Sequence, residues 1–119
     1  MRKILSCAGL GALLVLGTAM VHNHLVKSTP TAGTTLSASP KEVRLWFNER
    51  PTIAFTSVTL LRADSTKIVT IKAVATDDSL SVAAPLPTPL APGSYLVTWR
   101  TAGTDGHAIR GTYGFSIVP

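Results

Sequence analysis

Apolar and polar residues alternate along several short segments of the chain after residue 22. In one of them, Val43, Leu45 and Phe47 occupy every second position. A period of two places these side chains on one face of a β-strand. Similar runs, rich in Val, Ile, Thr, Leu and aromatic residues, predict strands at 25–26, 55–61, 68–71, 80–82, 95–100 and 113–117. Since no stretch after residue 22 shows a convincing 3.6-residue period, the pattern predicts an all-β domain.

Turn-forming residues separate these predicted strands. Ala63, Asp64 and Ser65 end the strand at 55–61, and the next segment is predicted to be its hairpin partner. Four prolines between 85 and 92 favour a stiff, extended crossover. About seven short strands with a turn signal every dozen or so residues predict a two-sheet, Greek-key, immunoglobulin-like β-sandwich.

The start of the chain differs in composition from the rest. Arg2 and Lys3 precede an uncharged stretch that extends to Val21. This arrangement is typical of a secretory signal peptide, and the Gly, Ser and Ala content of the stretch favours a cleaved signal over an uncleaved anchor. The sequence therefore predicts a signal peptide at 1–21 and one exported domain at 22–119, with no membrane span after cleavage.

Two cut sites are compatible with the preference of signal peptidases for small residues. Cleavage after Ala19 would leave Met20 and Val21 ahead of His22, whereas cleavage after Val21 would make His22 the first residue. The choice between them stays open at this point. It decides whether His22 has a free α-amine.

Composition and charge exclude several classes of protein. The chain has 119 residues, of which 45% are hydrophobic and 14% charged, and this excludes disorder. The formal charge of +5 falls to +3 when Arg2 and Lys3 leave with the signal. The remaining lysines and arginines are scattered singly along the sequence, so nucleic-acid binding is not expected. The only cysteine, Cys7, lies in the signal, so the exported domain has no disulfide and no thiol chemistry.

Histidines occur at two places in the exported domain: His22 and His24 at its start, and His107 further along. A histidine at a free N-terminus offers its α-amine and ring Nδ1, which can close a six-membered chelate ring on one metal ion. Asp105 and His107 share a face in an extended segment, and Gly106 lets the backbone bend between them. Such nitrogen and oxygen donors favour Cu(II) over tetrahedral zinc. Because the amine and the imidazoles must lose protons to bind, we expect affinity to fall in acid.

Four ordered motifs resemble the signatures of CopC-type periplasmic copper-binding proteins. They are HNHLVKSTPTAG at 22–33, VRLWFNE at 43–49, GSYLVTWR at 93–100, and DGH with IRG within 105–111. The resemblance covers essentially all of 22–119 and implies a Greek-key sandwich that binds one Cu(II) through His22, Asp105 and His107. It also implies Glu49 as an additional weak or outer ligand. His24 is the fallback ligand if His22 lacks a free amine.

The methionines depart from the family pattern. Some members carry a methionine-rich loop that binds Cu(I), but here the only methionines are Met1 and Met20. No thioether site for Cu(I) is expected. The resemblance thus implies a non-enzymatic periplasmic Cu(II) carrier for copper homeostasis, resistance or delivery, with a CopD-type inner-membrane copper transporter as a candidate partner.

Two other classes of function stay open at the level of sequence. An N-terminal histidine chelate with one more histidine also describes lytic polysaccharide monooxygenases, so a copper-dependent oxidase or monooxygenase is one alternative. A metal-free β-sandwich interaction module is the other, and it predicts that substitutions of His22 and His107 change nothing. Whether Asp105 ligates copper or only orients His107 is equally open.

Overall fold

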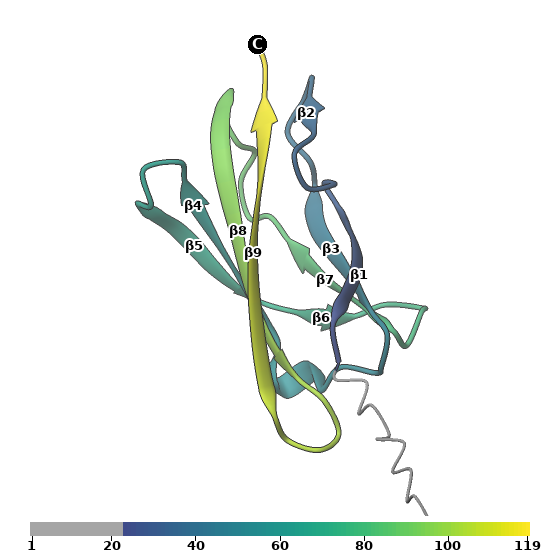
Figure 1. Ribbon diagram of the computed structural model, residues 1–119. Helices are drawn as coiled ribbons and strands as arrows, with labels where there is room; N and C mark the ends of the chain where they lie inside the picture. Colours follow the sequence, from purple (N-terminus) through teal and green to yellow (C-terminus); the bar gives the residue numbers. More distant parts are fainter. Residues whose placement is uncertain (1–22) are drawn as a thin grey trace, which may run out of the picture.

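Residues 23–119 are described in the computed structural model, and they form two β-sheets packed face to face (Figure 1). The predicted signal peptide at 1–21, its cut site and His22 lie outside the described residues. Within residues 23–119, no helix has the length and apolarity needed to cross a membrane.

One sheet has four strands in the spatial order β1-β3-β7-β6. Its strands are β1 (Leu25–Thr29), β3 (Glu42–Phe47), β6 (Val74–Ala75) and β7 (Ser81–Pro85). All three neighbouring pairs are antiparallel. The alternation in β3 is confirmed, because Val43, Leu45 and Phe47 are buried while the residues between them are half-buried.

The second sheet has five strands in the order β2-β9-β8-β4-β5. Its strands are β2 (Thr35–Leu36), β4 (Ser57–Arg62), β5 (Lys67–Lys72), β8 (Gly93–Ala102) and β9 (Ala108–Ile117). The proline-rich segment after β7 crosses from the first sheet to β8 in the second, as predicted. The predicted fold class, an all-β sandwich, is confirmed. The prediction missed β2 and β6, because strands of two residues are too short to show an alternating pattern.

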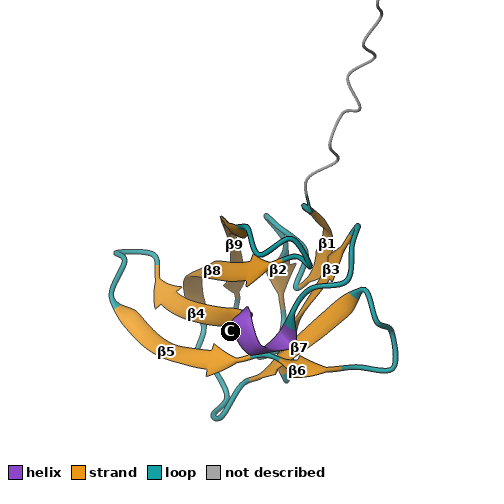
Figure 2. Cartoon of the chain, turned by 90° about the horizontal axis from the view of Figure 1, so that it is seen from below, coloured by secondary structure: helices purple, strands orange, loops and turns teal. Residues whose placement is uncertain are grey.

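Three residues predicted in strands lie outside them: Phe55, Thr56 and Leu80. Phe55 belongs to the 3-10 helix η1 (Ile53–Phe55), where its amide donates a hydrogen bond to the Thr52 carbonyl at 2.9 Å. Leu80 precedes β7 because its amide donates to the Asp78 carboxylate at 2.9 Å and so closes a turn. Both apolar side chains are exposed. Figure 2 looks onto this end of the sandwich and shows η1 at the junction of the two sheets.

The core fills the space between the sheets with apolar side chains. Two aromatic pairs anchor it: Phe47 meets Trp99 edge-on at 5.4 Å between ring centroids, and Tyr95 stacks on Phe115 at 5.6 Å. Trp99 lies so close to β9 that a Cβ at Gly111 would be 2.3 Å from its Cζ2 atom. Only glycine fits at that position. The buried aliphatic residues include Leu45, Val58, Leu60, Val82 and Val97.

Candidate metal centre

The turn at 103–107 joins β8 to β9 and projects from one end of the sandwich (Figure 1). The Gly106 amide donates to the Gly103 carbonyl at 3.0 Å, and Gly106 has a φ of +83°, which favours glycine. The amide of His107 donates to Oδ1 of Asp105 at 3.0 Å. These local hydrogen bonds fix the backbone between the two predicted ligands.

Asp105 and His107 form a side-chain pair within this turn. Nδ1 of His107 lies 3.0 Å from Oδ2 of Asp105. A carboxylate partner at Nδ1 favours the tautomer that carries its proton there, which leaves the Nε2 lone pair available to a ligand. The side chains are 78% and 52% exposed for His107 and Asp105 respectively, so the pair is open to solvent.

The pair is also electrostatically coupled. The hydrogen bond to His107 lowers the pKa of Asp105 below its ordinary value. Conversely, the hydrogen bond to Asp105 and, after it, the negative charge of that carboxylate raise the pKa of His107 above its ordinary value. Asp105 is therefore a carboxylate throughout the range in which His107 titrates.

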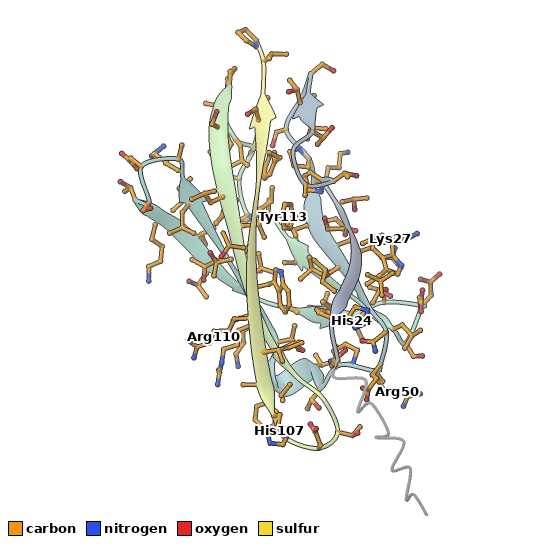
Figure 3. All side chains as sticks on the ribbon, viewed as in Figure 1. His24, Lys27, Arg50, His107, Arg110 and Tyr113 are labelled. Carbon is orange, nitrogen blue, oxygen red and sulfur yellow. The ribbon has the colours of Figure 1, made fainter. Side chains whose placement is uncertain are left out.

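The first described residues are held against the end of β3. The amide of His24 donates to Oδ1 of Asn48 at 2.6 Å, and the amide of Asn48 donates back to the His24 carbonyl at 3.2 Å. The side chain of His24 is exposed, and so is that of Glu49, which follows Asn48 in the chain. Figure 3 shows His24 and His107 toward the same end of the sandwich.

Asn23 connects the start of the chain to the 103–107 turn. A methyl group built on Gly103 would lie 3.5 Å from Oδ1 of Asp105 and 3.8 Å from Nδ2 of Asn23, so these two side chains flank Gly103. Asn23 is only 8% exposed, and both polar atoms of its amide are buried without a hydrogen-bond partner. Such orphaned groups are rare and call for an explanation. They fit a place that a further polar ligand completes.

Buried threonines connect η1 to the end of β8, next to the turn. Thr56 donates its hydroxyl to the Thr52 carbonyl at 2.8 Å and lies 2.7 Å from the Thr101 hydroxyl. The amide of Thr52 donates to the Ala102 carbonyl at 2.9 Å, directly before the turn. Since Thr56 and Thr101 are almost fully buried, this network links η1 rigidly to the end of β8.

Only two of the ligands predicted from sequence contact each other among the described residues. Asp105 and His107 are in contact, whereas Glu49 and His24 lie at the same end without joining them: among residues 23–119 there is no group of three or more His, Cys, Asp or Glu residues that could hold a metal ion. Sequence reasoning missed Asn23. The burial of Asn23 depends on Gly103, which is 80 residues away in the sequence. The one feature of the sequence that could have pointed to Asn23 is its position directly after His22.

Comparison with known proteins identifies similar chains. A family model described as the CopC domain matches residues 25–118. Copper resistance protein C of Escherichia coli is 32% identical, with 97% of this chain and 98% of that protein covered. The crystal structure of CopC from Methylosinus trichosporium OB3b matches with a TM-score of 0.76 at 33% identity, covering 82% of this chain and 95% of that one. Copper transport protein CutJ of Bacillus subtilis is 27% identical over 84% of this chain but only 19% of its own length.

Proposed function

Because the chain belongs to the CopC domain family, we propose that it binds copper as its cargo at the end of the sandwich where the N-terminal segment meets the 103–107 turn. One observation carries the proposal: Asn23, the residue after His22, lies beside Gly103 together with Asp105. Ligands from the start of the chain and from the turn can therefore reach one ion. The names of the relatives, which refer to copper resistance and copper transport, support copper as that ion.

The proposed ligands are the α-amine and ring nitrogen of His22 together with the ring of His107. Three nitrogens with a nearby oxygen match the tetragonal preference of Cu(II), and one such set holds one ion per chain. The only methionines of the sequence are Met1 and Met20, so residues 23–119 offer no thioether for Cu(I). His24 and Glu49 lie at the same end of the sandwich as additional candidates.

Asp105 acts in this proposal by orienting His107. Both carboxylate oxygens already accept hydrogen bonds from His107, one from the backbone amide and one at Nδ1. This leaves Nε2 of His107 as the nitrogen for copper, and a carboxylate behind an imidazole increases the basicity of its free nitrogen. The exposure of the pair allows copper to leave by ligand exchange with another protein.

The proposed setting is the periplasm, with copper passed to a transport protein. The chain is similar to about a fifth of a much longer copper transport protein, in which the matching segment and further sequence belong to one polypeptide. A separate carrier and a membrane transporter of the CopD type would divide the same task between two chains. The proposed role is copper resistance or homeostasis through binding and delivery, without turnover of a substrate.

Intact-mass analysis of the exported protein, made without an N-terminal tag, tests the proposal. We expect a mass that begins at His22 and that increases by one copper when the protein is sprayed natively with one equivalent of Cu(II). A mass that begins at Met20, or a protein that begins at His22 and takes up no copper, would contradict the proposed site.

Two matched variants locate the site within the protein. We expect His107→Ala to weaken Cu(II) binding more than about 100-fold, since loss of a ligand costs more than loss of a residue that orients one. His24→Ala is the comparison, because it removes an exposed histidine from the same end, and it should weaken binding less than His107→Ala. A smaller loss from His107→Ala than from His24→Ala, or no loss, measured by competition with a chelator, would contradict the assignment of His107.

A further inference from the structure

Three cations lie in one row across the outer face of the five-stranded sheet. Ser57 of β4 pairs with Lys72 of β5 on one side and with Arg100 of β8 on the other, and Arg100 pairs with Arg110 of β9. Directly paired residues share a face of the sheet. Lys72, Arg100 and Arg110, here called the cation row, are all exposed. Figure 3 shows Arg110 on the side of the molecule away from β1 and β3.

The cation row has no acidic partner. The ion pairs in the described part of the chain are Arg44 with Asp77 and His107 with Asp105, and neither includes a residue of the row. The cations of the other sheet are compensated differently. Nζ of Lys27 and Cζ of Arg44 lie 4.6 Å and 4.9 Å from the Trp46 ring centroid, over a π-system that attracts positive charge.

The neighbouring row on the same face consists of threonines. Their hydroxyls form two cross-strand hydrogen bonds, of 3.0 Å and 3.2 Å. The members of this row are Thr59, Thr70, Thr98 and Thr112. The face around the cation row therefore presents hydroxyl groups and positive charge, with no carboxylate among the paired positions of these two rows.

The charges of the cation row are expected to lower the stability of the sheet. Like charges directly opposite each other on neighbouring strands destabilise a sheet, and Arg100 and Arg110 are such a pair. An acidic residue at either position would stabilise this part of the sheet through a cross-strand ion pair. The like charges of Arg100 and Arg110 do not favour folding at this register, and this points to a role in contact with another molecule.

We propose that the cation row is a docking surface for an acidic face of a partner protein. Arginine pairs with carboxylates through two parallel hydrogen bonds, and the threonine hydroxyls add donors and acceptors beside them. Lipid headgroups fit less well, because recognition of an anionic membrane commonly uses four to eight basic residues. Single-stranded nucleic acid fits less well too, since the row has no aromatic side chain on which a base could stack.

The position of the row relates it to the candidate metal centre. Arg100 and Arg110 pair two positions before the hairpin closes at Ala102 and Ala108, next to the 103–107 turn. A partner seated on the row would therefore lie beside His107. Use of this surface in copper exchange rests on the proposed function, whereas docking itself does not depend on copper.

A titration with a hexaglutamate peptide, followed by amide chemical shifts of the 15N-labelled protein, tests the docking surface. We expect the shifts to concentrate at the cation row and the threonine row and to shrink as salt is added. The double variant Arg100→Gln/Arg110→Gln should bind the peptide about tenfold more weakly. The control Arg62→Gln/Lys67→Gln removes the same charge at the far end of β4 and β5, and it should leave binding unchanged.

Several results would overturn the proposal. Equal weakening in the control would show that net charge alone attracts the peptide. Binding through the row to phosphatidylglycerol vesicles or to single-stranded DNA, without binding of the peptide, would assign the surface to a different macromolecule.

A stability measurement separates docking from folding and from copper binding. We expect Arg110→Glu to unfold at the same temperature as the wild-type protein or a higher one, to lose peptide binding, and to keep its Cu(II) uptake. A lower unfolding temperature would overturn the proposal, because the row would then be structural. Failure of copper uptake in the wild-type protein would contradict only the proposed function.

Discussion

Two glycines of the β8–β9 hairpin lie in opposite environments. A methyl group at Gly111 would overlap the buried Trp99 ring, at 2.3 Å from Cζ2, whereas a methyl group at Gly103 would meet its neighbours at ordinary contact distances of 3.5 Å and more. Around Gly111 the interior is completely filled. Around Gly103 lie exposed ligands and a buried amide with no partner. Packing holds the core together, while the end that carries the candidate site keeps polar groups unsatisfied.

The largest effect that this comparison predicts is the difference between two alanine substitutions. We expect Gly111→Ala to lower the free energy of unfolding by about 3 kcal/mol, because Trp99 is wedged against Phe47 and cannot move aside. Gly103→Ala should cost less than about 1 kcal/mol. Urea unfolding of both variants measures the difference, and similar losses would show that the turn is packed as tightly as the core.

A buried threonine between the two regions should give the next largest effect. Thr56→Val keeps the shape of the side chain but removes the hydroxyl that serves both the Thr52 carbonyl and Thr101. We expect a loss of about 2 kcal/mol, since the buried partners are left unsatisfied. Thr59→Val, on the outer face of β4, is the control and should be nearly neutral. A neutral Thr56→Val would mean that the core and the turn are not linked by this network.

The core could be predicted from sequence because burial repeats along each strand. In β3, Val43, Leu45 and Phe47 fall at every second position, and all three are buried. Phe55 was predicted wrongly: it was expected to begin the strand at 55–61, but hydrogen bonds within residues 52–56 form η1 there, and its ring is exposed. Local polar contacts of this kind leave no periodic trace in the sequence.

The candidate site could be predicted only in part. Asp105 and His107 are close in the chain, so their contact follows from local geometry. The burial of Asn23 against Gly103 and the alignment of Arg100 with Arg110 depend on strand pairing and register. Spacing alone predicts neither, because a shift of one residue in register would move every side chain to the other face of the sheet.

The pH dependence of copper binding should follow the Asp105–His107 pair. Asp105 raises the pKa of His107, so protons compete with copper for Nε2 already at a pH above the ordinary pKa of histidine. Below the raised pKa, each pH unit should weaken binding about tenfold for this one proton, equivalent to about 1.4 kcal/mol. In Asp105→Asn the pKa of His107 should return toward its ordinary value, and the acid loss should begin at lower pH.

Proton NMR of the His107 ring and copper titrations at the same pH values measure this prediction. A His107 pKa that is identical in the wild-type protein and in Asp105→Asn would contradict the coupling seen between the two side chains. The contrast with the core is direct, because the aliphatic side chains that fill it carry no titratable group, and unfolding of the core responds to packing.

The smallest change in stability is expected at Asn23. Truncation of a buried core residue leaves a cavity and costs about 2 to 5 kcal/mol, but truncation of Asn23 to alanine also removes two buried polar atoms that lack partners. These opposing terms should leave the free energy of unfolding of the copper-free protein within about 1 kcal/mol of the wild type. Asn48→Ala is the control: it removes the acceptor of the His24 amide and should be more destabilising.

For copper binding we expect the opposite order, with Asn23→Ala having the larger effect and Asn48→Ala the smaller. If the amide of Asn23 is completed by the arriving ion, its ligands or a bound water, Asn23→Ala should weaken Cu(II) binding about tenfold while the copper-free fold is unaffected. Chelator competition, on variants whose first residue has been checked by mass, measures the loss. An Asn23→Ala protein that binds copper normally, or that unfolds as readily as Asn48→Ala, would show that this amide belongs to the packing of the sandwich. The division between a satisfied core and an unsatisfied site would then not hold.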